Sequence, residues 1–266
     1  MSFFYWKNLK IHYVYENENT NTPLVLFFHG FNDSLSTFNP ILKLNRNFRF
    51  AAIDFPGCGL SEFKNNQINL EQYFKVASEF VNTILQHEKN IIVVGHSLGG
   101  ASALFLNDIK SIKHTILLSP INEFLLKYKD TKSLKEKLLP LTVNQCINSY
   151  ESLFAILTER ISKIASFTCS KRANQFQNVY NKFFYLVEFN ILNENYLSNN
   201  LARLYFQKQN ITIISGENDL YTTKEEILSV QEKYQIPVIL LKQTGHAIIF
   251  EQPKEILKLI EEKIKQ

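Results

Sequence analysis

IIVVGHSLGG, residues 91–100, is the stretch that decides the fold. Four β-branched apolar residues predict a buried strand, and a helical pattern follows at residues 98–108. The chain has 8 glycines in 266 residues, yet three of them lie within these ten positions. The pattern G-x-S-x-G between a strand and a helix is typical of a strained turn that exposes its serine. The stretch therefore predicts that Ser97 is a nucleophile, although a mere tight turn would also use these residues.

Other apolar runs surround this stretch and end in turn residues. Their continuity, without alternation, is typical of parallel strands buried on both faces. They cover residues 24–30, 48–57, 115–120, 211–216 and 237–246. Residues 3–6 and 10–16 predict an N-terminal hairpin. Helical patterns at 70–84, with Asn69 as N-cap, and at 253–266 alternate with the strands, so the fold class is α/β, a mostly parallel doubly wound sheet.

Residues 121–205 interrupt this alternation. They contain no convincing strand, and they are too long for a plain crossover connection. Two helical patterns are present: Leu153, Ile156, Leu157, Ile161 and Ile164, then Phe176, Val179, Tyr180, Phe183 and Val187. We predict a helical cap at 121–205, inserted into a core formed by residues 1–120 and 206–266.

The glycines mark one end of the predicted sheet. Each lies at or just after the carboxyl end of a predicted strand, where open α/β sheets bind ligands. They are Gly30, Gly57, Gly59, Gly95, Gly99, Gly100, Gly216 and Gly245. Glycines that only terminate strands would explain any one of these positions but explain their clustering poorly.

Several motifs in order carry a family resemblance. HGFN at 29–32, DFPGCGLS at 54–61, GHSLG at 95–99, GEND at 216–219 and GH with EQP at 245–253 resemble serine hydrolases of the α/β-hydrolase fold. The resemblance is to the lipase- and esterase-like group with a helical cap, and it covers nearly the whole chain.

This resemblance implies a Ser-His-Asp triad. A serine hydroxyl needs a base, and His246 lies in the loop that carries the family's catalytic histidine. Asp219 follows the preceding strand, and the order Ser97, Asp219, His246 is that of the fold. Glu217 and Glu123 are the alternative acids.

The other histidines receive no catalytic role. We expect His12 and His87 to be solvated, His114 to precede a strand, His96 to occupy the variable position of the serine turn, and His29 to brace its loop.

The resemblance also assigns the groups that would stabilise an oxyanion. The amide of Leu98, after the nucleophile, and the amide of Phe31, in the loop after the strand at 24–30, are the candidate donors. Asp54 is expected to bind loop amides. Cys58 is expected to fill a turn, with a reactive thiol as the alternative.

Haloalkane dehalogenases and epoxide hydrolases of this fold carry an aspartate at this turn. The serine at position 97 therefore favours acyl transfer to water over those two reactions. We predict hydrolysis of a carboxylic ester with an apolar acyl group. Aromatic residues of the cap could line its pocket, and they include Phe154, Phe167, Phe183, Phe184 and Phe189. A proline-iminopeptidase-like aminopeptidase, a thioesterase and a carbon–carbon hydrolase are alternatives, as is an inactive binding module of the same fold.

Composition excludes other classes. The net charge is +4 and no run of five or six basic residues occurs, so no nucleic-acid partner is predicted. Three cysteines, Cys58, Cys146 and Cys169, argue against a disulfide framework and favour a reducing, cytoplasmic location. Neither a signal peptide nor a membrane span is predicted. We expect a small-molecule acyl ester as partner, no cofactor or metal, and a monomer or small homo-oligomer.

Overall fold

The computed structural model describes residues 1–18, 21–64 and 67–265. Eight strands form one sheet in the order β1-β2-β4-β3-β5-β6-β7-β8. They are β1 (Ser2–Trp6), β2 (Leu9–Tyr15), β3 (Leu24–Phe28), β4 (Arg49–Ile53), β5 (Ile91–His96), β6 (Ile112–Leu118), β7 (Ile211–Gly216) and β8 (Val238–Leu241). β1 and β2 form the predicted hairpin, β2 pairs antiparallel with β4, and every other pairing is parallel.

Helices cover both faces of this sheet. The core helices are α1 (Asn39–Leu42), α2 (Leu70–Thr83), α3 (Gly99–Leu106), α10 (Lys224–Tyr234), α11 (Ile248–Glu251) and α12 (Pro253–Ile264). Helices α2, α3 and α10 pack on one face, and α1, α11 and α12 on the other. Successive residues of β3 enter the two cores alternately, which explains why its sequence is apolar throughout. The prediction of a doubly wound sheet is confirmed.

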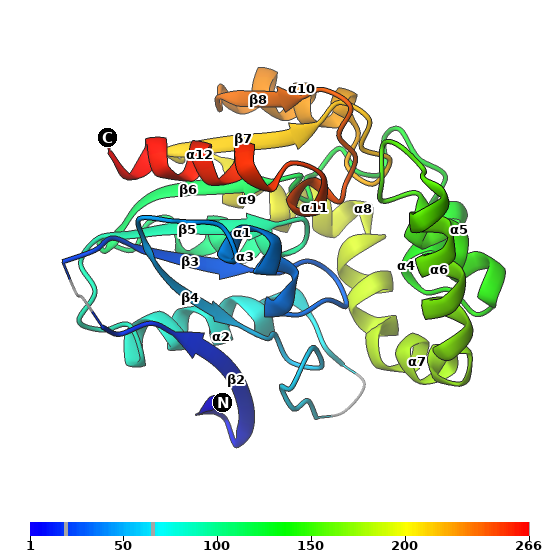
Figure 1. Cartoon of the computed structure of the whole chain (residues 1–266), viewed down its shortest axis with the longest axis horizontal. Helices are drawn as coiled ribbons and strands as arrows, with labels where there is room; N and C mark the ends of the chain where they lie inside the picture. The colour runs from blue at the N-terminus through cyan, green and yellow to red at the C-terminus, as the bar shows by residue number, and fades with distance from the viewer. Residues whose placement is uncertain (19–20, 65–66, 266) are drawn as a thin grey trace.

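The segment between β6 and β7 is helical, and its described residues contain no strand. In Figure 1 its helices over residues 131–186 lie beyond the end of the sheet to which the arrows of β3 and β7 point, whereas its last helix lies behind the sheet, against α3. They are α4 (Thr131–Leu138), α5 (Val143–Glu151), α6 (Glu159–Lys171), α7 (Phe176–Leu186), α8 (Glu194–Tyr196) and α9 (Ala202–Tyr205), with a short 3₁₀ turn (Ala173–Gln175) and two π-helical turns (Val187–Ile191, Leu197–Leu201). We refer to residues 121–205 as the cap segment.

The first of the two helical patterns in the cap segment was wrong as a continuous helix. α5 ends at Glu151 and α6 begins at Glu159, so Leu153, Ile156 and Leu157 lie in the connection. The hydroxyl of Thr158 accepts a hydrogen bond from the amide of Ile161 and begins α6 as its N-cap. The second pattern is confirmed as α7.

The expectation against disulfides was also wrong. Cys146 of α5 and Cys169 of α6 form a disulfide, with their Cα atoms 5.7 Å apart. Their separation of 23 residues matches no short motif, so the bond could not be predicted from spacing. The cytoplasmic location, which rested partly on reduced cysteines, stays a prediction. No helix in the described residues is long and apolar enough to cross a membrane.

The loop after β4 is held by Asp54. Its carboxylate accepts hydrogen bonds from the amides of Leu35 at 2.7 Å and Leu60 at 2.9 Å, as predicted. It also binds Nδ1 of His12 at 2.7 Å. His12 is therefore buried, and the expectation that it would be solvated was wrong: the loop after β4 covers the hairpin.

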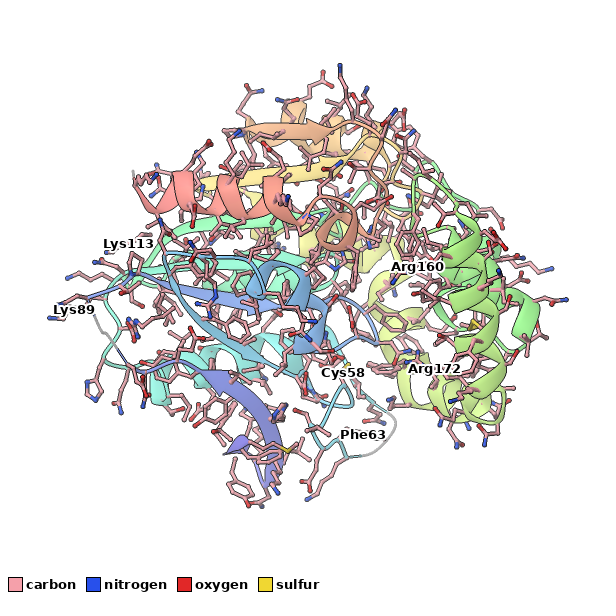
Figure 2. The ribbon with its side chains drawn as sticks, viewed as in Figure 1. Cys58, Phe63, Lys89, Lys113, Arg160 and Arg172 are labelled. Carbon is pink, nitrogen blue, oxygen red and sulfur yellow. A yellow bond between two sulfur atoms is a disulfide. The ribbon has the colours of Figure 1, made fainter. Side chains whose placement is uncertain are left out.

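Cys58 lies in the same loop, on the side of the core that faces the cap segment (Figure 2). Burial raises the pKa of its thiol to about 12. This shift disfavours the reactive thiolate, and the side chain is buried in the core, as expected of a residue that fills a turn.

The turn between β5 and α3 depends on very close backbone contact. A Cβ atom on Gly99 would lie 2.4 Å from the carbonyl oxygen of Phe28 in β3, and one on Gly95 would lie 2.6 Å from the carbonyl oxygen of Gly99. Neither neighbour is a flexible side chain. The two glycines thus let α3 begin directly against the end of β3.

We expect Gly99→Ala to lower the free energy of unfolding by about 1–3 kcal/mol, because the methyl group forces backbone apart. Urea denaturation measures the change. The matched control is Ser102→Ala in the same helix, which removes a buried hydroxyl that has no hydrogen-bond partner among the described residues. Equal stability of the Gly99→Ala variant and the unaltered protein would contradict the steric argument.

Candidate active site

Ser97 lies at the point where β5 turns into α3. Its φ angle is +52°, in the left-handed region that side chains rarely adopt. Its amide donates to the carbonyl oxygen of Leu118 at 2.8 Å, and its own carbonyl accepts from Gly100 and Ile121. Ser97 is the one residue of 91–100 that is not buried. The fold thus holds the backbone rigidly while it exposes the hydroxyl.

The structure brings Ser97, His246 and Asp219 into one hydrogen-bonded chain. Nε2 of His246 lies 2.9 Å from Oγ of Ser97, and Nδ1 of His246 lies 2.8 Å from Oδ2 of Asp219. Since an ionised carboxylate only accepts, the imidazole proton belongs on Nδ1 and Nε2 is free to accept the serine proton. This is the arrangement that a serine nucleophile with a histidine base requires.

Asp219 is a fully paired buried anion. Burial favours its neutral form, but the charge of His246 and hydrogen bonds from the imidazole and from the amides of Thr222 and Tyr221 outweigh that effect and lower its pKa. The hydroxyl of Thr222 adds a further bond at 3.0 Å. Asp219 is therefore ionised at neutral pH, which stabilises His246 when it gains a proton.

The two alternative acids are engaged elsewhere. Glu123 pairs with Lys233 at 2.9 Å and accepts from the hydroxyl of Tyr234. Glu217 pairs with Lys224 at 3.4 Å. The structure thus brings Asp219, and neither glutamate, to His246.

The two predicted oxyanion donors flank Ser97. Gly30 and Phe31 line the same cavity as Ser97, and a Cβ atom on Gly30 would lie 3.2 Å from Cβ of Ser97. Leu98 follows Ser97 and precedes the first residue of α3. Within the described ranges, the amides of Phe31 and Leu98 donate to no protein group. Neither amide is therefore occupied by a protein acceptor, as the prediction of an oxyanion site requires.

His29 braces the loop that carries Phe31. Its Nε2 accepts from the amide of Phe55 at 3.0 Å, so its Nδ1 carries the proton and donates to the carbonyl oxygen of Gly30 at 2.7 Å. Burial lowers the pKa of His29 despite the nearby charge of Asp33, so the ring stays neutral. The prediction that it braces rather than titrates is confirmed.

His96 has a part that the sequence did not suggest. Its Nε2 donates to the carbonyl oxygen of His246 at 3.0 Å and so fixes the loop that carries the imidazole. Burial, together with the nearby His246, lowers the pKa of His96 to about 3, and the ring is neutral. His96, the residue directly before Ser97, therefore helps to position His246.

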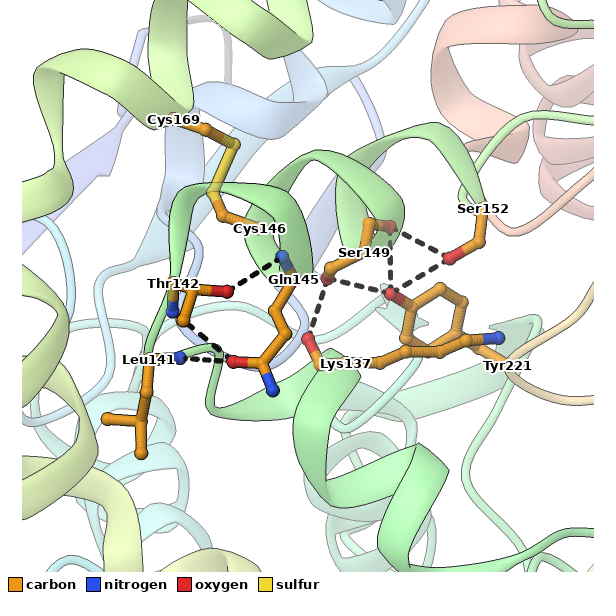
Figure 3. The surroundings of a disulfide bond; sticks show 9 residues. All are labelled: Lys137, Leu141, Thr142, Gln145, Cys146, Ser149, Ser152, Cys169 and Tyr221. Atoms are coloured by element: carbon orange, nitrogen blue, oxygen red, sulfur yellow. Dashed lines mark hydrogen bonds between the residues drawn. A yellow bond between two sulfur atoms is a disulfide. The ribbon is translucent and has the colours of Figure 1, made fainter.

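Tyr221 connects this chain to the cap segment. Its amide donates to Asp219 at 2.7 Å, and its ring lies 5.0 Å from that of His246. Its hydroxyl donates to the carbonyl oxygen of Ser149 in α5 at 2.9 Å (Figure 3). Tyr221 thus bonds to the buried carboxylate through its amide and to the cap segment through its hydroxyl.

A second connection reaches the loop of His246. The carboxylate of Glu251 accepts from the amide of Gly245 at 2.7 Å and from the amide of Ala155 at 2.9 Å. The amide of Ala247 donates to the carbonyl oxygen of Leu153 at 2.7 Å. The connection between α5 and α6 is therefore docked on the loop that carries His246.

A cavity of about 490 Å³ opens over Ser97. Core and cap segment both line it. Apolar contacts come from Leu138, Pro140, Leu153, Phe154, Ile249 and Phe250, and charged ones from Asp33, Lys137 and Arg172. Of the five cap aromatics considered, only Phe154 lines the cavity: Phe183 is buried in the core, and Phe167, Phe184 and Phe189 are exposed. In the described ranges, no group of three or more His, Cys, Asp or Glu side chains could hold a metal.

The fold, the serine turn and the hydrogen-bonded chain define a class. The model of the alpha/beta hydrolase family matches residues 25–259, and the chain belongs to that family.

Curated relatives narrow the comparison. The chain is 28% identical over 207 residues to "Putative esterase/lipase 2" of Mycoplasma genitalium, covering 74% of this chain and 71% of the relative. It is 32% identical over 103 residues to "Putative esterase/lipase 2" of Mycoplasma pneumoniae, a match that spans 38% of that relative's length and 37% of this chain.

Among solved structures, MGS-M2, an alpha/beta hydrolase from a deep-sea metagenome, superposes with a TM-score of 0.75 at 16% identity. That match covers 100% of this chain and 98% of MGS-M2. At this identity the likeness shows the fold alone.

We expect Glu251→Gln to weaken the contact between the cap segment and the loop that carries His246. A glutamine offers one oxygen where two amides now donate to the carboxylate, so one amide loses its acceptor and stability falls by about 1–3 kcal/mol. Hydrogen exchange measures the effect as faster exchange at Gly245 and Ala155. Glu255→Gln in α12 is the control, because its carboxylate pairs with the exposed Lys258 and with no other cation in the part of the chain that the structure describes. Unchanged exchange at both amides would contradict the docking argument.

Proposed function

We propose that the protein is a carboxylic ester hydrolase that acts through an acyl-enzyme on Ser97. The observation that carries the proposal is the continuous chain from Ser97 through His246 to Asp219 beside two unpaired amides. The names of the two mycoplasma relatives support an ester substrate.

In the proposed mechanism, Oγ of Ser97 attacks the ester carbonyl carbon while its proton passes to Nε2 of His246. The carbonyl oxygen becomes an oxyanion and accepts hydrogen bonds from the amides of Phe31 and Leu98. His246 then returns the proton to the leaving alcohol. Water, deprotonated by His246, attacks the acyl carbon of the acyl-enzyme. His246 then returns this proton to Oγ of Ser97 as the bond between Oγ and the acyl carbon breaks and the acid leaves. Asp219 holds the imidazole and stabilises its positive form throughout.

We further propose that residues 121–205 form a cap on a core of residues 1–120 and 206–266. Support comes from the cavity lining, since Leu138, Pro140, Leu153 and Phe154 supply much of its apolar surface. These residues would hold an apolar part of the substrate, while the reacting carbonyl lies over Ser97.

The charged residues of the cavity disfavour the aminopeptidase alternative. Such an enzyme must bind the ammonium group of a free N-terminus, and a buried cation needs an anionic partner. The described residues that line this cavity include two cations, Lys137 and Arg172, and one carboxylate, Asp33. An ester or thioester without an ammonium group suits it better.

We expect Ser97→Ala to lower kcat/KM for a short-chain 4-nitrophenyl ester on the order of 10⁴-fold or more. The loss follows because no other side chain at the turn can form the acyl-enzyme. Steady-state kinetics measure it, with Ser102→Ala as the control for loss of a serine in α3. A loss of less than tenfold would mean that another group is the nucleophile.

A further inference from the structure

Two cationic side chains line the cavity over Ser97, and the proposed mechanism of ester hydrolysis gives neither of them a role. Lys137, the penultimate residue of α4, is half-buried, and Arg172, directly after α6, is exposed at the cavity. Within the described residues, neither forms an ion pair with a carboxylate. Figure 2 shows Arg172 on the flank of the cap segment that faces the core.

Lys137 lies close to the reacting groups. Its Nζ is 5.4 Å from the centre of the Tyr221 ring (Figure 3). That ring is 5.0 Å from the ring of His246. Burial lowers the pKa of Lys137, while the charge of Asp219 opposes that shift. A cation held here pays a desolvation cost that an anion in the cavity would offset.

The cap segment fixes both cations in one wall. The hydroxyl of Ser149 in α5 donates to the carbonyl oxygen of Lys137 at 2.6 Å, which holds the end of α4 against α5. The disulfide from Cys146 to Cys169 then holds α5 against α6, three residues before Arg172. Figure 3 shows both ties on the same helix, α5. The cations are therefore on anchored helix ends.

Among the described residues that line this cavity, Asp33 is the only carboxylate. It comes from the core, in the loop after β3, and its Oδ1 accepts from the amide of Ser34 at 2.8 Å. It neutralises one of the two cations at most. The charge of Asp219 also acts on Lys137, but that carboxylate is buried and hydrogen-bonded to His246, and it is not among the described residues that line the cavity.

We propose that Lys137 and Arg172 bind an anionic group on the substrate, so that the protein prefers esters that carry a carboxylate or a phosphate beside an apolar part. This proposal rests on the proposed function, because it names the substrate class of the same site. Lys137 and Arg172 would be specificity-determining residues, and the apolar lining from Leu138 to Phe154 would hold the uncharged part.

Two pairs of esters that differ in one charged group test the preference. Mono-4-nitrophenyl glutarate against 4-nitrophenyl pentanoate places a carboxylate on the acyl chain. 1-Butanoylglycerol 3-phosphate against 1-butanoylglycerol places a phosphate on the alcohol. We expect kcat/KM to favour the acidic member of at least one pair by about tenfold or more, and the pair that responds identifies the side of the ester that bears the anion.

The variants assign the preference to the two cations. Lys137→Met and Arg172→Gln should each lower the acidic-to-neutral ratio by about tenfold, whereas Lys137→Arg should retain most of it. Lys132→Met in α4 and Lys171→Met in α6 are matched controls, since both lysines are exposed and neither lines the cavity. A ratio of one or less in both pairs, or a ratio that neither variant lowers, would overturn the proposal.

A binding measurement separates this proposal from the proposed function. Calorimetric titration of the Ser97→Ala protein with mono-4-nitrophenyl glutarate and with glycerol 3-phosphate should show affinity for at least one, lost in the Ser97→Ala/Lys137→Met double variant. Binding with this dependence but no hydrolysis of any ester would refute the esterase and support the anion site. Hydrolysis of the neutral esters without such binding would support the esterase and refute the anion site.

Discussion

The backbone at Ser97 is the constraint on which the other features depend. A left-handed conformation at a residue with a side chain costs about 1–3 kcal/mol, and it persists because its surroundings leave no alternative. Gly99 packs against the end of β3, and the amide of Ser97 is bonded to Leu118 at the end of β6. Three neighbouring strands thus hold the turn, and the hydroxyl emerges where the glycine-bearing loops converge.

The cap segment and the hydrogen-bonded chain form one mechanical unit. Tyr221 connects the buried carboxylate of Asp219 to Ser149 of α5, and Glu251 connects the loop of His246 to Ala155. A displacement of α5 would therefore reach both the acid and the base. These two attachments hold the cap segment against the core, so residues of both line the cavity.

The sequence predicted what depends on local pattern: the strands, the serine turn, and the positions of Asp219 and His246. It failed where distant segments meet. The buried pairing of His12 with Asp54 arises because a loop covers the hairpin, and the break between α5 and α6 arises because Leu153 docks on the histidine loop. The helical repeat of 3.6 residues in a sequence predicts neither the pairing nor the break, because both depend on contacts between distant segments. Lys137 likewise resembles any solvated lysine of an amphipathic helix until the fold places it in the cavity.

The central claim is that the fold activates Ser97 as a nucleophile, and covalent labelling tests it most directly. The folded protein is treated with a fluorophosphonate, and intact-mass and peptide mass spectrometry then locate the adduct. We expect one adduct, on Ser97, that is absent from the heat-denatured protein and from the His246→Ala variant. No adduct on the folded protein, or an adduct on a different residue, would contradict the account and favour an inactive binding module or another nucleophile.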